Sequence, residues 1–395
     1  MFANNYLLKN NRVPLIVSEP NPQCNISIVI PCYNEPELLL TLESLKNCSL
    51  PETIVEVIIL INHAEDAPEE IKNFNIATKN EAERWIKENY SNKLNFFAIG
   101  PVELRKKWAG VGLARKTGLD EAVLRFNHFN NTRGIVVSLD SDSLVEHNYL
   151  IEIEKHFKQN PKHVGATIKV EHQKVGLSEK QKHGIELYEK FLHYYKDALQ
   201  FAGYPQAMIT IGSAFAVTAE AYVKRGGMNR RLAGEDFYFL QNLAQLGTVG
   251  EINTTRVFPS ARLSNRVPFG TGAAIQKWME GTEDLTKTYN FKAFTDLKLF
   301  FDVNEKLFRV SDERYLNIIS GFPKSIRQFL LQDNFWIELD DLNKNCSTLK
   351  SFQTRFFHKF NAFKVLKFMN FAHDGFYEKA DLEEQISTFK ILAKK

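Results

Sequence analysis

Gly134-Ile-Val-Val-Ser-Leu-Asp-Ser-Asp142 is the stretch from which the fold of this chain can be inferred most directly. Its apolar part is short and rich in β-branched residues, which is typical of a strand buried in a parallel sheet. Asp140 and Asp142 follow where that strand is expected to end. Residues two apart on an extended backbone point to the same side, so the two carboxylates can converge while Ser141 faces away. In open α/β sheets, ligands bind beyond the carboxyl ends of the strands, so we expect a ligand there.

The acidic pair has the chemistry of a divalent-cation site. Mg²⁺ or Mn²⁺ is typically held by one or two carboxylates, with substrate phosphates and water completing the coordination. We therefore predict Asp140 and Asp142 as ligands of Mg²⁺ or Mn²⁺. The alternative is a turn with solvated side chains, because Asp-Ser-Asp is also favourable turn chemistry.

Length and composition set the broad class. The 395 residues are enough for two domains, or for one large domain with an extension. With 50 Lys and Arg against 47 Asp and Glu, and no long basic run interleaved with aromatic residues, nucleic acid is not expected as a partner. We expect a cytoplasmic protein, since its start lacks a signal peptide pattern and no apolar run reaches the ~20 residues that span a bilayer. Peripheral contact with the inner face of the membrane stays open. The cysteines show no metal-ligand spacing and indicate reduced thiols: Cys24, Cys32, Cys48 and Cys346.

Apolar runs that alternate with helical patterns predict a mostly parallel sheet flanked by helices, an α/β fold. Strands are expected over residues 26–30, 54–61, 94–99, 135–139, 164–170, 208–217 and 249–257. Helical patterns cover residues 38–45, 113–129, 178–201, 237–246, 297–308 and 351–371. We divide the chain into an N-terminal arm (1–25), an α/β domain (26–285) and a helical C-terminal extension (286–395).

The first strand runs into Pro31-Cys-Tyr-Asn-Glu-Pro36. Asn34 is a capping residue type, and Pro36 and the carboxylate of Glu37 suit a first helical turn, so we expect a helix to begin here. The N-terminus of a helix favours an anion, although ordinary capping explains Asn34 by itself.

Four segments, in order, resemble family 2 glycosyltransferases. Ile26-Ser-Ile-Val-Ile-Pro-Cys-Tyr-Asn-Glu35 is similar to the opening segment V-x-I-P-x-Y-N-E, which in that family cradles the donor nucleotide. Gly110-Val-Gly-Leu-Ala-Arg-Lys-Thr-Gly118 resembles G-x-x-x-A-R-N-x-G, residues 140–142 resemble the D-x-D metal triplet, and Gly234-Glu-Asp-Phe-Tyr-Phe-Leu240 resembles the E-D segment. The likeness spans roughly residues 26–247. Each motif alone is weak, but four in order are specific.

The resemblance implies the GT-A fold and an inverting, hexosyltransferase-type reaction in which a nucleotide-sugar donor glycosylates an acceptor hydroxyl. It implies Asp236 as the base that takes the hydroxyl proton, with Glu235 as a supporting or acceptor-binding group. A helix N-terminus stabilises carboxylates too, which is the structural alternative for both. The residues we predict to hold the donor are Pro31, Tyr33, Asn34, Glu35, Asn62, Arg115, Ser141 and Arg266.

Three positions bear on the choice of donor and on the binding of its diphosphate. Asn62 stands where many relatives carry an Asp that pairs with uracil, so either a UDP- or a GDP-sugar is expected. Lys116 replaces the family's Asn, and this additional cation faces either the diphosphate or solvent. Arg266 precedes a Gly- and Pro-rich loop, and its fork suits phosphate oxygens, although arginines also flank surface turns.

Two other functions are each compatible with part of the sequence. Sugar nucleotidyltransferases share a GT-A-like sheet and a divalent cation, but they carry a Gly-rich basic loop after the first strand, where this chain has Cys-Tyr-Asn-Glu-Pro. A non-catalytic nucleotide-sugar or partner-binding domain is disfavoured by the presence of all three acids, Asp140, Asp142 and Asp236. The acceptor is expected to be a glycan, a lipid-linked sugar or a small molecule.

Overall fold

Strand β1 (Cys24–Cys32) is the strand around which the sheet is built in the computed structural model, which describes residues 1–263 and 270–393. It pairs in parallel with β2 (Ile54–Ala64) on one side and with β4 (Ile135–Ser138) on the other. β2 pairs in parallel with β3 (Leu94–Leu104). Because all four strands run the same way, their carboxyl ends meet at one edge of the sheet.

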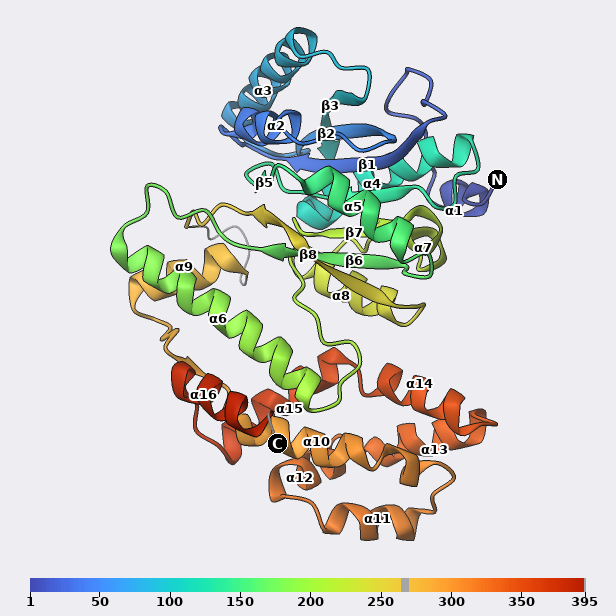
Figure 1. Ribbon diagram of the computed structural model, residues 1–395, viewed down its shortest axis with the longest axis vertical. Helices are drawn as coiled ribbons and strands as arrows, with labels where there is room; N and C mark the ends of the chain where they lie inside the picture. Colours follow the sequence, from blue (N-terminus) through green and yellow to red (C-terminus); the bar gives the residue numbers. More distant parts are fainter. Residues whose placement is uncertain (264–269, 394–395) are drawn as a thin grey trace. The chain divides into compact units, whose positions relative to one another are not determined.

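The other half of the sheet is mixed. β7 (Phe215–Thr218) lies antiparallel between β4 and β6 (Gly165–Val170). β8 (Val249–Phe258) runs parallel to β6, and β5 (Leu144–Val145) pairs antiparallel with β8. Within the described residues the main sheet therefore has eight strands in the order β3-β2-β1-β4-β7-β6-β8-β5 (Figure 1). The predicted α/β fold with a mostly parallel sheet flanked by helices is confirmed.

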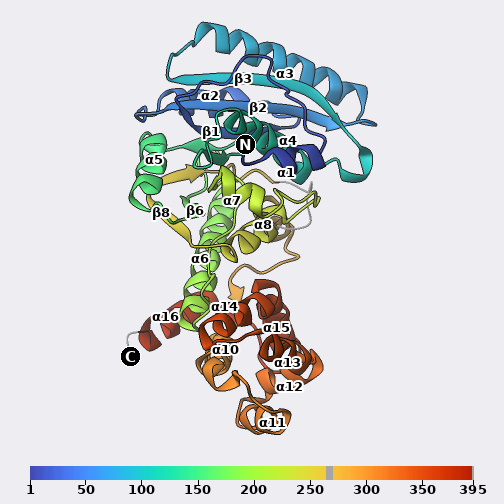
Figure 2. The same cartoon turned by 90° about the vertical axis from the view of Figure 1, so that its right-hand side faces the viewer.

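The helices cover both faces of the sheet, as the burial of β1 requires. Alternate side chains of β1, those of Ile26, Ile28 and Ile30, belong to one buried cluster with side chains of α2 (Leu38–Lys46) and α5 (Tyr149–Gln159). On the other face, Val29 packs against α4 (Val111–His128). A Cβ atom on Gly118 of this helix would lie 2.4 Å from Cγ1 of Val29. Figure 2 shows α3 (Glu69–Glu88) lying along β3. The close approach of α4 to β1 explains the glycine in this helix.

The chain divides into two compact units, residues 1–176 with 210–273 and residues 177–209 with 274–395. The first holds the sheet, together with α1 (Asn4–Lys9), the 3₁₀ turn η1 (Lys106–Trp108), α7 (Ala219–Lys224) and α8 (Glu235–Ala244). The division places residues 177–209 with the C-terminal part, whereas the expected bounds at residues 25 and 285 stay predictions.

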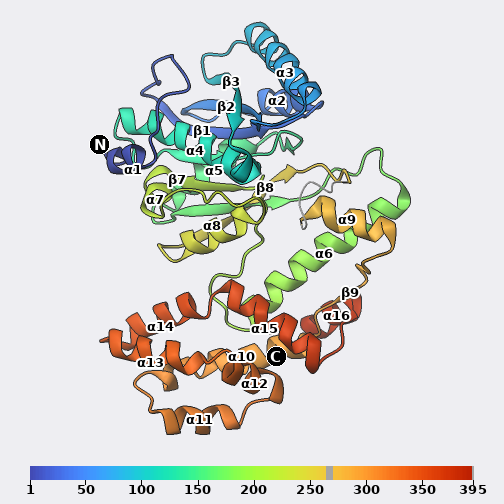
Figure 3. The same ribbon diagram turned by 180° about the vertical axis from the view of Figure 1, so that it is seen from behind.

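The second unit is built mainly from helices (Figure 3). Its core is aromatic, as the phenylalanine-rich sequence indicates, and Phe294, Phe300, Phe335, Phe356 and Phe360 are fully buried. A short two-stranded sheet pairs β9 (Lys287–Thr288) with β10 (Ala380–Asp381). The helical segments are α6 (Glu179–Phe201), α9 (Thr271–Glu280), α10 (Phe291–Asp302), η2 (Asn304–Leu307), α11 (Asp312–Ser320), α12 (Lys324–Gln332), α13 (Phe335–Asn345), α14 (Leu349–Lys359), α15 (Ala362–Gly375) and α16 (Leu382–Leu392). None of the helices described, here or in the first unit, is long and apolar enough to cross a membrane.

Several predicted elements differ from the structure. Asn34 does not cap a helix: its φ is 48°, and α2 begins only at Leu38, after Glu37. The strand expected over residues 208–217 begins at Phe215. The single helix expected over residues 351–371 is divided, because the side chain of Asn361 accepts the N–H groups of Phe363 and Lys364 and starts α15.

Candidate functional site

The acidic triplet lies in a turn beyond the end of β4. The strand ends at Ser138, and the N–H of Ser143 donates to the carbonyl of Asp140 at 3.1 Å. The extended spacing assumed from the sequence is therefore wrong. The two carboxylates still share one environment: burial, followed by the charge of Asp140, raises the pKa of Asp142 to about 6. Each carboxylate is about a third exposed and is bound by an arginine.

Arg115 joins the acidic turn to the E-D segment. It lies near the start of α4 with only 2 % of its side chain exposed, and its guanidinium donates to both Asp140 and Glu235. Gly212 makes room for it, because a Cβ there would lie 2.6 Å from Nη2 of Arg115. The predicted donor-site arginine is thus held between two of the predicted acids.

Asp236 lies near the same arginine at the start of α8. Gly234 precedes the helix with a φ of 69°, a left-handed conformation that suits glycine. The N–H of Phe237 donates to Oδ1 of Asp236 at 2.7 Å. Burial, and next the charge of Glu235, raise the pKa of Asp236 to about 6, against the opposing effect of Arg115. Asp140 also contributes to this shift, so the third acid shares the environment of the acidic turn.

A second arginine, Arg262, closes the site from the segment after β8. Its Nη2 lies 2.5 Å from Oε2 of Glu35 and 3.0 Å from Oδ2 of Asp142. Nη1 lies 3.7 Å from the more exposed Glu37. From sequence we preferred Arg266 for this role, and Arg266 lies outside the described residues. We use "acid cluster" for five acids, of which Glu35 and Glu235 are buried, and their two arginines: Glu35, Asp140, Asp142, Glu235, Asp236, Arg115 and Arg262.

The end of β1 is fixed by two asparagines. The side-chain amide of Asn62 donates to the carbonyls of Cys32 at 2.9 Å and Leu60 at 3.2 Å. Asn75, fully buried in α3, donates to the carbonyl of Asn62 and accepts the N–H of Asn34. Because its N–H donors are engaged within the protein, Asn62 has only Oδ1 left for a base edge. Asn75 was missed from sequence, although Asn75, Thr78 and Ala82 form a buried stripe at helical spacing.

The other predicted donor residues lie at the same edge of the sheet. Pro31 is buried in β1 opposite Leu60, and Tyr33 follows the end of that strand. Ser141 contributes its carbonyl, which accepts the hydroxyl of Thr41 at 2.9 Å and ties the acidic turn to α2.

Lys116 faces neither diphosphate nor solvent, so both expectations for it are wrong. Its Nζ is buried, 2.6 Å from the hydroxyl of Tyr6 and 3.2 Å from Asp120. Asp120 also accepts Tyr6 and Tyr222 hydroxyls and pairs with Arg12 at 2.6 Å. We name this group the Asp120 cluster: Tyr6, Arg12, Lys116, Asp120 and Tyr222. It fastens the N-terminal segment to α4, the helix that carries Arg115.

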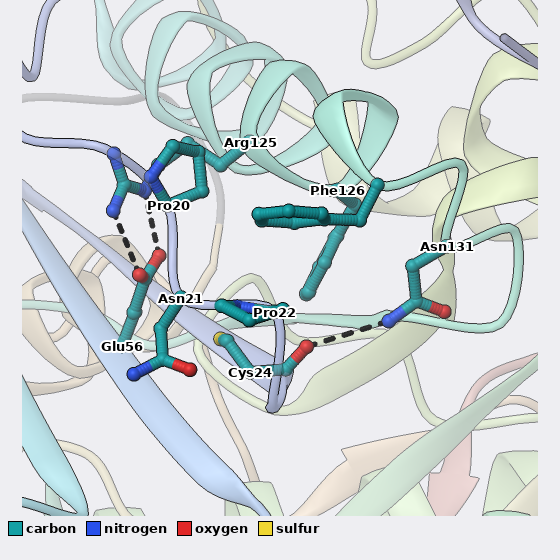
Figure 4. A pocket seen from close by; sticks show the side chains of 9 residues that line it. Pro20, Asn21, Pro22, Cys24, Glu56, Arg125, Phe126 and Asn131 are labelled. Atoms are coloured by element: carbon teal, nitrogen blue, oxygen red, sulfur yellow. Dashed lines mark hydrogen bonds and ion pairs between the residues drawn. The ribbon is translucent and has the colours of Figure 1, made fainter.

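A small hollow lies at the opposite, amino-terminal end of β1 and β2 (Figure 4). The fork of Arg125 binds the carboxylate of Glu56 through two 2.7 Å contacts at its side, and Asn131 donates to the carbonyl of Cys24. All of these groups are paired with one another, and none of the predicted site residues lines the hollow. The acid cluster, not this hollow, is the candidate functional site.

Comparison with known proteins gives one family match. A family model described as "Glycosyl transferase family group 2" matches residues 135–303, which include β4, the acidic turn and the E-D segment. No curated protein sequence gives a significant match.

Among solved structures, residues 1–349 of S. aureus TarS in complex with UDP-GlcNAc are similar at 14% identity, over 85% of this chain and 91% of that chain, with a TM-score of 0.43. The same TarS segment in complex with UDP gives 12% identity, 90% and 93% coverage, and a TM-score of 0.42. The family model and the four ordered motifs point to the same family: the chain is similar to family 2 glycosyltransferases over residues 135–303.

Proposed function

We propose that this glycosyltransferase moves a sugar from a nucleotide-diphosphate donor to an acceptor hydroxyl, with inversion at C1 and with a divalent cation. The observation that carries the proposal is the acid cluster at the carboxyl ends of the strands. There Asp236, with a raised pKa, lies in the same electrostatic environment as Asp140 and Arg115. Perturbed carboxylates at the ligand-binding edge of an α/β sheet are typical of a catalytic site.

The charge balance of the acid cluster fits a divalent cation. Five carboxylates face two guanidinium groups, which leaves a formal surplus of three negative charges. Burial raises the pKa values of Asp142 and Asp236, and the charges of neighbouring acids raise them further. The described residues contain no group of three or more His, Cys, Asp or Glu side chains arranged to hold a metal by themselves. The fit is therefore to an ion bound by Asp140 and Asp142 whose remaining ligands are phosphate and water.

Each protein group then has a defined task. When held by Asp140 and Asp142, Mg²⁺ or Mn²⁺ supplies stabilisation of the negative charge on the leaving diphosphate. Asp236, ionised at neutral pH, accepts the proton of the acceptor hydroxyl, whose oxygen bonds to C1 while the bond from C1 to the diphosphate oxygen breaks. Arg115 keeps Glu235 and Asp140 in place. Glu235, bound to Arg115, has a supporting or acceptor-binding role.

A donor screen tests the proposal. The full chain is incubated with a panel of UDP- and GDP-sugars and either Mn²⁺ or EDTA, and nucleoside diphosphate released by donor hydrolysis is measured. We expect at least one donor to be hydrolysed with Mn²⁺ but not with EDTA, and Asp142→Asn to abolish that hydrolysis. The exposed Asp374→Asn serves as the matched control and should behave like the wild type. Release of pyrophosphate in place of nucleoside diphosphate, or the absence of any nucleotide turnover and binding, would contradict the proposal.

A further inference from the structure

We propose that the pair Glu35–Arg262 is a clamp for the donor diphosphate, in which Arg262 serves as the counter-ion of Asp142 until donor and cation bind. The inference rests on the proposed function and assigns it a further binding residue and a positioning residue. Nη2 of Arg262 contacts both Glu35 and Asp142; it gives up the contact with Asp142 and turns the freed N–H to the phosphate oxygens, while its contact with Glu35 is kept.

The two arginines of the acid cluster differ in their freedom to move. Arg115 is 2 % exposed and is bound at both ends to buried acids. Arg262 is 39 % exposed and lies in the irregular segment after β8. A long side chain with one exposed edge can change partner without disturbing the core. Arg262 is therefore the arginine that can respond to a ligand.

Glu35 gives Arg262 a fixed pivot. The side chain of Glu35 is only 2 % exposed, and its second oxygen accepts the N–H of Glu37 at 3.0 Å. A buried carboxylate needs a charged partner, so loss of the whole Glu35–Arg262 pair is unfavourable. A guanidinium has five N–H donors in a planar fork, so one N–H of Nη2 can stay on Glu35 while its second N–H and Nη1 bind phosphate oxygens.

The contact with Asp142 is the one that must be released. Nη2 of Arg262 lies 3.0 Å from Oδ2 of Asp142, one of the two carboxylates proposed to hold the cation. A guanidinium and a divalent cation repel each other when both bind the same carboxylate. A bound diphosphate allows the guanidinium of Arg262 and the cation to occupy the site together, because its negative charge gives the guanidinium another anion to bind.

The clamp is tested by two affinities, that for Mn²⁺ alone and that for a nucleoside diphosphate, which should change in opposite directions. We measure binding of Mn²⁺ alone by electron paramagnetic resonance of the free ion, and binding of UDP and GDP by calorimetry at saturating Mn²⁺. In Arg262→Gln we expect Mn²⁺ alone to bind roughly tenfold more tightly and the preferred nucleoside diphosphate roughly tenfold more weakly. Arg262→Lys keeps the charge but loses the fork, so it should leave Mn²⁺ binding close to the wild type and still weaken the diphosphate.

Arg256→Gln is the matched control. Arg256 is also paired with two glutamates, Glu146 and Glu171, but outside the acid cluster, so both affinities should stay unchanged. Arg262 variants that leave both affinities unchanged, or weaken both together, would overturn the clamp while wild-type binding upholds the proposed function. A wild-type chain that binds neither Mn²⁺ nor a nucleoside diphosphate would overturn the proposed function and the clamp with it.

Discussion

The acid cluster and the Asp120 cluster lie side by side on α4 and are built on opposite charge balances. Arg115 and Lys116 are consecutive residues, and each enters a different cluster. In the Asp120 cluster a single buried carboxylate receives two cations and two tyrosine hydroxyls. In the acid cluster five carboxylates share two arginines.

The charges of the Asp120 cluster stabilise the fold, whereas those of the acid cluster are available to a ligand. A carboxylate surrounded by donors is satisfied by the protein itself and holds the N-terminal segment against α4. Carboxylates in surplus raise one another's pKa, and a further cation balances their charge. Such unbalanced sites are typical of function. The same helix thus provides a structural fastening and one wall of the candidate site.

The largest effect is expected when the base is removed from the acid cluster. Asp236→Asn should lower the rate of sugar transfer by about 10³-fold, because general-base catalysis contributes about 10²–10⁴-fold. Donor affinity should be retained, and the thermal midpoint should be equal to the wild type or higher, since a carboxylate with a raised pKa destabilises the folded state when charged. Transfer assays, calorimetry and thermal unfolding check these three results; full turnover by the variant would remove Asp236 from the role of base.

The next effect concerns the arginine that holds two acids. Arg115→Gln leaves Glu235 and Asp140 without their buried partner, so the free energy of unfolding should fall by about 3–5 kcal/mol. Urea unfolding measures this change. Arg256→Gln, in which the solvent-screened pairs with Glu146 and Glu171 are lost, should lower the free energy of unfolding far less. Equal, small losses for both variants would mean that Arg115 is not the structural link between the two acidic segments.

The Asp120 cluster should affect stability and leave catalysis alone. Asp120→Asn keeps the shape and one hydrogen-bond acceptor but leaves Lys116 and Arg12 without a charged partner, and should lower the free energy of unfolding by about 2–4 kcal/mol. The kcat of the folded variant should change by less than about threefold, because none of the partners described for Asp120 belongs to the acid cluster. A large loss of kcat in a well-folded variant would show that the two clusters are not separate.

The smallest effect is expected in the pH dependence, which should be opposite for stability and for kcat/KM. The pKa values of Asp142 and Asp236 are raised from 3.8 to about 6, so between those values the folded state binds more protons than the unfolded state. Their contribution to stability therefore falls as pH rises from about 4 to about 6. Over the same window kcat/KM should rise with pH, by about tenfold per unit below the pKa of Asp236, as the base ionises. Activity that is independent of pH between 5 and 7 would contradict this assignment.

Local patterns in the sequence predicted the sheet and most of the acids. The central strands are buried on both faces, so their β-branched runs were recognisable, and the acids lie in short motifs directly after a strand or a glycine. The partners of those acids were not predictable, because they come from distant segments: Arg262 and Glu35 are 227 residues apart. Asn34 shows a local rule that tertiary structure overrides, since its N–H binds Asn75 and its backbone adopts a left-handed conformation in place of a cap.

The most direct test of the account is a crystal structure of the full chain with Mn²⁺ and the nucleoside diphosphate that the donor screen identifies, with the metal located by anomalous scattering. The account predicts an anomalous peak in contact with the carboxylates of Asp140 and Asp142 and with the diphosphate, and Asp236 facing the cavity that holds them. A peak elsewhere on the protein, or a diphosphate bound away from these carboxylates, would contradict it.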